Sequence, residues 1–213
     1  NDKVIVQYAS IYANRNLSFK DNPTERERLK AWSAVSSGLY IYEYPQDALN
    51  VCLPYDGLHV FADNLRFSKE LGFSSYFMQG NFNTQSSGFT ELKVYVASKL
   101  MWDSSLNPNE LAYDYIENVY GEAAPVMKEF FDALRTRLAY LRNQYNYGSF
   151  VLNDGLSTTY WPRNLMVVYQ SMFDEAYAAI DSLQYIDEER YEVLFRKIKI
   201  EEMFVKYVNC SLY

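Results

Sequence analysis

The segment Leu39-Tyr40-Ile41-Tyr42-Glu43-Tyr44 is rich in aromatic and branched residues, which predict a β-strand that Pro45 ends. Two further runs have the same character, residues 4–9 before it and residues 73–79 after it. Around these runs the apolar periodicity predicts helices over residues 24–36, 58–71 and 89–102, and Thr24-Glu25-Arg26-Glu27 has the form of a capping box that opens the first of them. Strands that alternate with helices of this length are typical of βα units, so we expect a parallel sheet.

From residue 107 onward the sequence predicts helices throughout. The run Asn107-Pro108-Asn109-Glu110 combines an N-cap residue, a first-turn proline and a capping glutamate. Apolar residues then recur at three- and four-residue steps over residues 127–141, 165–183 and 191–198. Each of these helices has one apolar face, so we expect them to pack on one another. We therefore expect a sheet-containing part, residues 1–103, and a helical part, residues 104–213.

Three parallel strands leave a sheet incompletely covered, since a parallel sheet normally has both faces and its edges protected. One interpretation is that these are the last three βα units of a TIM-type (β/α)8 barrel, with the first five units outside this chain. In that case a missing N-terminal barrel segment, or self-association through exposed strand edges, completes the sheet. The alternative is an open three-stranded α/β layer.

Composition excludes several classes of protein. The chain has 213 residues, 49% hydrophobic and 22% charged, so it can bury a core. Its formal net charge of −7 gives no basic field to attract nucleic acid. Its apolar runs all fall short of the roughly 20 residues that a bilayer crossing needs, so we expect no membrane partner. With one histidine, His59, and two distant cysteines, Cys52 and Cys210, we expect neither a metal site nor a cofactor, while a disulfide stays open.

Three pieces of the sequence resemble a known family. They are residues 72–80 (GFSSYFMQG), 91–103 (ELKVYVASKLMWD) and 120–125 (YGEAAP). In this order they resemble the bacterial family catalogued as domain of unknown function 4838, common in gut Bacteroidetes, and the resemblance covers most of residues 4–138. It implies a glycoside-hydrolase-like barrel, similar to that of the family 20 hexosaminidases and the α-glucuronidases, with a helical C-terminal extension. It also implies a periplasmic or cell-surface location.

Cleavage of a glycosidic bond uses two carboxyl groups, a proton donor and a base or nucleophile, held about 5 to 10 Å apart. In a barrel they stand at the C-terminal ends of strands, and Glu43 is the acid at such a position. Its neighbours Tyr42 and Tyr44 could desolvate it and raise its pKa toward that of a proton donor. We predict Glu43 as a catalytic residue if Leu39 and Ile41 face the barrel interior. If the tyrosines face inward instead, Glu43 is a rim or salt-bridge residue.

Aromatic and amide side chains gather at the same predicted edge of the sheet. An amide can exchange hydrogen bonds with sugar hydroxyls, and an aromatic ring can stack on a sugar ring. Core packing is the alternative for each ring. We predict six substrate-binding residues here: Tyr8, Tyr12, Tyr44, Gln79, Asn81 and Phe82.

Two functions are therefore open. The first is a glycoside hydrolase of which this chain is the C-terminal part, inactive by itself, with Asp47 or Asp56 as candidates for a second carboxylate. The second is a non-catalytic protein that binds glycan or another chain. In both cases we interpret Tyr95, Trp102 and Tyr120 as packing residues of the helices after the sheet.

Overall fold

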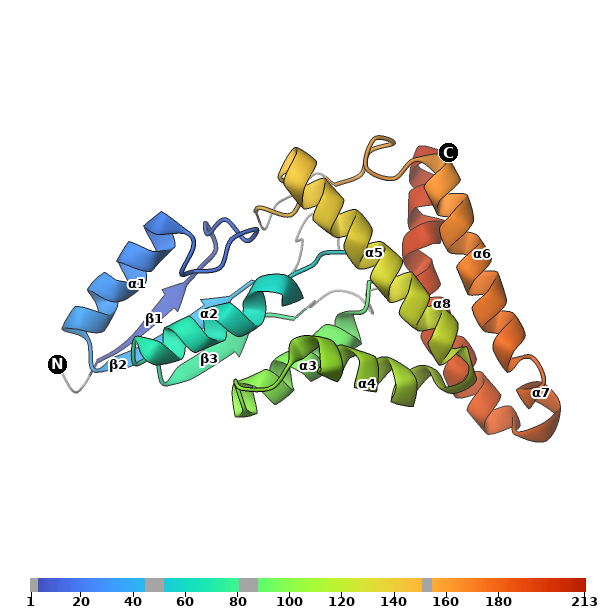
Figure 1. Ribbon diagram of the computed structural model, residues 1–213, viewed down its shortest axis with the longest axis horizontal. Helices are drawn as coiled ribbons and strands as arrows, with labels where there is room; N and C mark the ends of the chain where they lie inside the picture. The colour runs from blue at the N-terminus through green and yellow to red at the C-terminus, as the bar shows by residue number, and fades with distance from the viewer. Residues whose placement is uncertain (1–3, 45–51, 81–87, 151–154) are drawn as a thin grey trace.

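The computed structural model describes residues 4–44, 52–80, 88–150 and 155–213 (Figure 1). The strands are β1 (Ile5–Ala9), β2 (Gly38–Glu43) and β3 (Ser75–Met78). The helices are α1 (Pro23–Val35), α2 (Leu58–Glu70), α3 (Thr90–Trp102), α4 (Pro108–Tyr120), α5 (Ala124–Tyr145), α6 (Arg163–Ile180), α7 (Leu183–Ile186) and α8 (Glu188–Leu212), with a 3-10 turn, η1 (Gly121–Ala123). The predicted α/β class is confirmed. The sheet lies at one end of the molecule and the paired helices α6 and α8 lie at the other.

β2 is the central strand and pairs in parallel with β1 and β3, as the sequence predicted. The register places Tyr8 beside Ile41 and Ile41 beside Tyr76, so these side chains point to one face of the sheet. Helices α1 and α2 cover that face, because Leu29 of α1 and Phe67 of α2 belong to the same apolar cluster as Ile41 (Figure 1). We call it the covered face.

The opposite face, which we call the open face, carries Ile5, Tyr40, Tyr42 and Phe77. Ile5 is 75% exposed and Phe77 is 42% exposed, so the described part of the chain leaves this face accessible to solvent. β1 and β3 each have one neighbouring strand, so their outer edges are unpaired within the described ranges. Both the barrel interpretation and the open-layer alternative are compatible with this arrangement and stay predictions.

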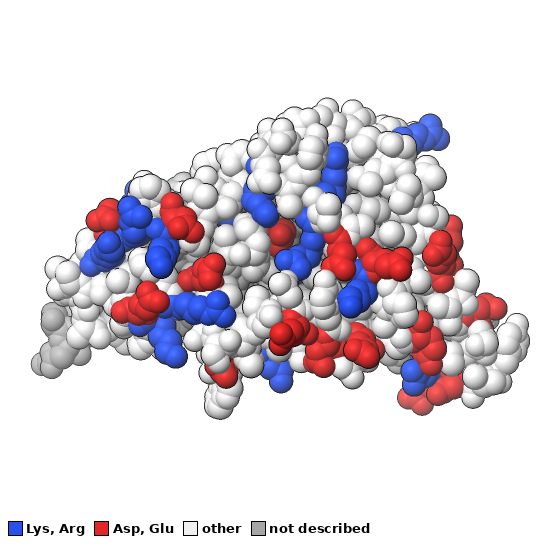
Figure 2. All heavy atoms as spheres, in the orientation of Figure 1, with Lys and Arg blue, Asp and Glu red and all other residues white. Residues whose placement is uncertain are grey.

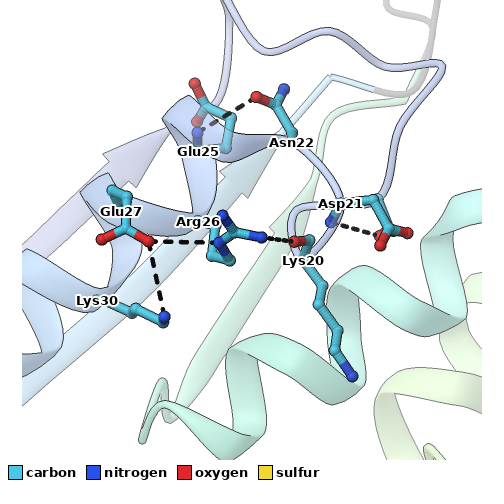
Figure 3. A network of polar contacts seen from close by, with 8 residues as sticks. Lys20, Asp21, Asn22, Glu25, Arg26, Glu27 and Lys30 are labelled. Atoms are coloured by element: carbon cyan, nitrogen blue, oxygen red, sulfur yellow. Dashed lines mark hydrogen bonds and ion pairs between the residues drawn. The ribbon is translucent and has the colours of Figure 1, made fainter.

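Helix α1 begins differently from the prediction, which took Thr24 as the first residue of a capping box. The N-cap is Asn22, whose Oδ1 accepts the backbone N–H of Glu25 at 3.4 Å, and a proline follows it at the first helical position. Arg26 then donates to the carbonyl of Lys20 at 3.2 Å and ties the preceding loop to the helix (Figure 3). Asparagine caps at least as well as threonine, and proline loses no hydrogen bond in the first turn, so this start prevails.

The main apolar core lies among the helices and extends toward the sheet. It runs from Leu53 to Val208 and includes Phe61 of α2 and Leu92 of α3, so the predicted packing of the helices on one another is confirmed. In the segment just before α6, Trp161 is fully buried in this core, and its indole N–H donates to the carbonyl of Gly155 at 2.8 Å. The expected division after residue 103 stays a prediction, and α2 and α3 share this core with the later helices.

The packing role predicted for Tyr95, Trp102 and Tyr120 is confirmed for Tyr120, is partly met by Tyr95 and fails for Trp102. Tyr120 is buried in the main core, and Tyr95 packs against that core while partly exposed. Trp102 is 94% exposed, so its interpretation as a packing residue is wrong within this chain. Trp102 is the last residue of α3, and with the partly exposed Met101 it lines an open hollow beside α2 and β3.

Further expectations concern charge, cysteines and helices. Figure 2 shows basic and acidic side chains interspersed on the visible face rather than gathered into one basic patch. Cys52 and Cys210 are not joined by a disulfide. Within the described ranges, every helix is too short or too polar to cross a bilayer. The same ranges contain no cluster of three His, Cys, Asp or Glu residues that could hold a metal ion.

The two faces of the sheet predict different mutational costs for the same side chain. Ile41→Ala should lower the free energy of unfolding by about 2–5 kcal/mol, because Ile41 is fully buried on the covered face. Ile5→Ala on the open face should cost less than about 1 kcal/mol in this chain. Urea unfolding of both variants measures the difference, and equal costs would contradict the assignment of the faces.

Candidate functional site

The candidate site is the carboxyl edge of the sheet, where the three strands end side by side. The register puts Ala9 beside Tyr42 and Glu43 beside Met78, so the loops that follow the strands start at one level. Ligands of open parallel sheets bind at this edge, in the crevice beyond the strand ends. The side chains on each face of this edge therefore decide what the site can bind.

Glu43, the last residue of β2, points to the covered face. Its Oε1 accepts a hydrogen bond from Asn64 Nδ2 of α2 at 2.8 Å, and its Oε2 accepts one from the hydroxyl of Tyr76 in β3. The tyrosines of β2 point to the open face. Of the two orientations that the sequence left open, the structure has the one in which Glu43 lies behind the sheet. Its predicted catalytic role stays untested.

Burial raises the pKa of Glu43, although hydrogen bonds from Tyr76 and Asn64 and the positive charge of Arg15 act in the opposite direction. Burial, and then the adjacent charge of Glu43, raise the pKa of Tyr76 well above its ordinary value. Arg15 comes from the loop after β1, and its guanidinium carbon lies 5.3 Å from the centre of the Tyr55 ring. A raised pKa suits a proton donor, but the hydrogen bonds to α2 and β3 also suit a residue that holds the edge together.

The open face of the edge carries an aromatic and amide cluster, which we call the Tyr42 cluster: Tyr42, Tyr44, Phe77 and Gln79. The ring of Tyr42 lies 4.9 Å from that of Tyr44 and 4.7 Å from that of Phe77, centre to centre. The Tyr42 hydroxyl donates to Gln79 Oε1 at 3.0 Å. The backbone N–H of Gln79 donates to the carbonyl of Glu43 at 2.9 Å, which fixes Gln79 at the end of the sheet.

The structure brings together two of the six predicted substrate-binding residues, Tyr44 and Gln79, through Tyr42. Tyr8 lies apart from them on the covered face, where its hydroxyl donates to Glu25 of α1 and burial raises its pKa to about 12. Tyr12 is 81% exposed in the turn after β1. The other two, Asn81 and Phe82, lie outside the described residues. A role in binding stays a prediction for all six.

Of the two acids considered as a second carboxylate, Asp47 lies outside the described residues and Asp56 is held in an ion pair. Asp56 Oδ2 lies 3.4 Å from a guanidinium nitrogen of Arg142 and 3.6 Å from Nδ1 of His59. Burial raises its pKa, but His59 and the charges of Arg135 and Arg142 outweigh burial and lower that pKa to about 2. Asp56 therefore stays ionised and links the loop before α2 to α5.

Sequence reasoning missed the partners of Glu43. Asn64 is buried within α2, and it also accepts the backbone N–H of Phe19 through Oδ1 at 2.7 Å. Asn64 could have been identified as a polar residue on the apolar side of a predicted helix. Such a residue is expected to have a hydrogen-bond partner, since buried polar groups are normally hydrogen-bonded. Tyr76 and Arg15 gave no comparable signal, because an aromatic residue in a strand and a basic residue in a loop are ordinary.

The contact between Tyr76 and Glu43 predicts the effect of removing one hydroxyl. Tyr76→Phe should raise the pKa of Glu43 further, because it deletes a hydrogen bond that favours the carboxylate. It should also cost about 1–3 kcal/mol of unfolding free energy. Carbon-13 NMR titration of Glu43 and urea unfolding measure both effects. Tyr12→Phe, at an exposed ring, is the control that should change neither, and an unchanged pKa in Tyr76→Phe would contradict the contact.

Comparison with known proteins identifies the family of this chain. A protein-family model described as "Domain of unknown function (DUF4838)" matches residues 1–132, which include the whole sheet, α1 to α4 and the candidate site. The comparisons find no match among curated proteins or among solved structures. The resemblance seen in the sequence is thus borne out at the level of the family, and the chain belongs to the DUF4838 family.

Proposed function

We propose that this chain supplies a sugar-binding edge to a glycoside-hydrolase-type protein, and that the Tyr42 cluster contacts the glycan. The observation that carries the proposal is the position of this cluster, on the open face and at the carboxyl edge of a parallel sheet. In the barrel interpretation the open face is the inner wall, so these side chains would line the substrate channel.

The chemistry of the cluster suits a sugar ring. Tyr44 and Phe77 flank Tyr42 and offer flat apolar surfaces, on which the C–H face of a pyranose can stack. An amide side chain both donates and accepts hydrogen bonds, as sugar hydroxyls require. The bond from the Tyr42 hydroxyl orients the amide of Gln79 before any ligand arrives, which reduces the entropy lost on binding.

Hydrolysis, if this protein carries it out, needs a proton donor and a second carboxylate. The raised pKa of Glu43 supports the first role, in which Glu43 would act at the carboxyl edge itself because its side chain lies on the covered face and not on the channel wall. A carboxylate from elsewhere in the full-length protein would supply the second. We propose that this chain alone is inactive and that a further barrel segment, or self-association through the strand edges, completes the site. We also propose a periplasmic or cell-surface location, which rests on family resemblance alone.

The second candidate function is non-catalytic glycan binding or scaffolding. It is favoured by the surroundings of Glu43, because both oxygens of this carboxyl already accept hydrogen bonds on the covered face. A group held in this way positions β2 and β3 for the Tyr42 cluster without touching substrate. The two candidates therefore share the binding edge and differ in whether Glu43 meets the scissile bond.

The binding edge can be tested in the full-length protein on a glycan array, followed by calorimetry with the best ligand. Tyr42→Ala should weaken binding about tenfold or more, since loss of a stacked ring costs on the order of 1.4 kcal/mol. Tyr40→Ala, on the same face but further from the carboxyl edge, is the matched control and should bind normally. Equal affinity of the Tyr42 variant and the wild type would refute the proposed edge.

The role of Glu43 can be tested with aryl glycosides whose leaving groups differ in acidity. If Glu43 donates the proton, Glu43→Gln should lower kcat/KM about 100-fold or more for poor leaving groups and much less for activated ones. Undiminished turnover by Glu43→Gln would remove Glu43 from the mechanism. Glycan binding by the wild type without any hydrolysis would favour the second function.

A further inference from the structure

Glu201 of α8 caps a helix that lies far from it in the sequence. This side chain is buried, and its Oε2 accepts the backbone N–H of Phe89 at 2.7 Å. Phe89 is the N-cap residue of α3, with a left-handed backbone (φ 58°), and its own side chain makes no capping hydrogen bond. Glu201 Oε1 also lies 3.3 Å from the hydroxyl of Tyr120 at the end of α4. One carboxyl group therefore joins α8 to α3 and α4.

Phe89 and Tyr120, which both contact Glu201, belong to a seam of aromatic rings. The ring of Phe89 lies 5.0 Å from that of Phe131 and 5.7 Å from that of Phe130, with Tyr120 at 6.2 Å, centre to centre. Such a seam has a low dielectric, in which an ionised carboxyl is far more costly than a neutral one. The protonation state of Glu201 thus affects how firmly α8 holds the start of α3.

Charged groups approach Glu201 from each neighbouring element. Lys93, one turn into α3, donates to the carbonyl of Tyr55 at 2.6 Å, and its charge favours the ionised form of Glu201. The titratable groups whose charges act on this pair are Asp56 in the loop before α2, Glu91 on α3, and Tyr115 and Tyr120 on α4. Behind them, His59, Arg135 and Arg142 face Asp56, and Lys197 of α8 pairs with Glu91.

We propose that Glu201 is a pH-responsive clamp, which holds the first turn of α3 against α8 and α4 when it is protonated and loosens it when it ionises. The neutral carboxyl still accepts the Phe89 N–H through its carbonyl oxygen and adds no charge to the aromatic seam. The ionised carboxyl adds a buried negative charge, which the backbone N–H groups of Gly88 and Phe89, the Tyr120 hydroxyl and the charge of Lys93 oppose but do not fully offset.

The direction of the effect follows from the shifts in this cluster. Burial raises the pKa of Glu201 to about 7, against the opposing effects of the Phe89 N–H and the Lys93 charge. Burial lowers the pKa of Lys93 to about 8, so Lys93 stays protonated below neutrality. Because the folded pKa of Glu201 lies above its ordinary value, its contribution to stability is complete below about pH 4.5 and is lost as the pH rises through about 7.

The adjacent Glu202 provides a matched control. It is also buried, but it accepts hydrogen bonds from Gln170, Tyr177 and Lys206, at 2.8, 2.9 and 2.6 Å. Burial raises the pKa of Glu202, but these three partners outweigh burial and lower that pKa. Its contribution to stability is therefore present above its ordinary pKa and is lost in acid, the opposite sign to that of Glu201.

Hydrogen exchange of the whole chain between pH 5 and 7.5 tests the clamp. Protection factors for Phe89 and the first turn of α3, corrected for the intrinsic exchange rate at each pH, should fall by about tenfold or more as the pH rises. Glu201→Gln should abolish this pH dependence, and Glu202→Gln should retain it. Protection that is constant across this range in the wild type, or pH dependence that persists in Glu201→Gln, would overturn the proposal.

Two further measurements keep the test decisive if a variant fails to fold. Carbon-13 NMR of the wild type should give a midpoint near pH 7 for the Glu201 carboxyl, and a midpoint below pH 5 would overturn the clamp. Histidine is the other side chain type that could cause a pH dependence in this range, so His59→Gln is a control. If Glu201 is responsible, this variant should leave the pH dependence at α3 unchanged. Loss of that dependence in His59→Gln would assign it to His59 and contradict the role of Glu201.

Discussion

Among the described residues, helices cover one face of the parallel sheet only, and this constraint determines the rest of the site. α1 and α2 bury Ile41 and its neighbours, so Leu39 and Ile41 of β2 are removed from solvent. Strand alternation then sends Tyr40 and Tyr42 to the other side. Glu43 lies two residues after Ile41, so its side chain points to the same, covered face of the sheet. There it accepts hydrogen bonds from Asn64 and Tyr76.

Two glutamates, the half-buried Glu43 and the buried Glu201, connect elements that are distant in the sequence. Glu43 joins β2 to α2 and β3, whereas Glu201 joins α8 to α3 and α4. In each case burial raises the pKa and donors from neighbouring elements oppose that rise. A buried carboxyl without such donors would be strongly destabilising, so both contacts specify which elements pack together. The sheet and the helices are thereby held in one arrangement by polar contacts as well as by the shared apolar core.

Local patterns predicted most of the secondary structure. The three strands, the parallel pairing and the helix that begins after Asn107 follow from alternation, periodicity and capping chemistry, all of which act over a few residues. The helix α1 was predicted to within one residue of its start, but its N-cap was misassigned because an Asn-Pro cap competed with a nearby Thr-x-x-Glu pattern. Trp102 was misread because its residue type predicts burial, while its exposure depends on which elements surround the end of α3.

The candidate site was only half predictable for the same reason. Acids, amides and aromatic rings at the carboxyl ends of the strands were predictable from the amino-acid order, because the order of residues along each strand is local information. The face that each side chain occupies depends on the packing of the helices. This packing brings Tyr42 to Gln79 on the open face and Glu43 to Asn64 on the covered face. The physical reason is that helices α1 and α2 bury the face carrying Leu39 and Ile41, and a pattern of period two cannot say which of its two faces a helix will cover.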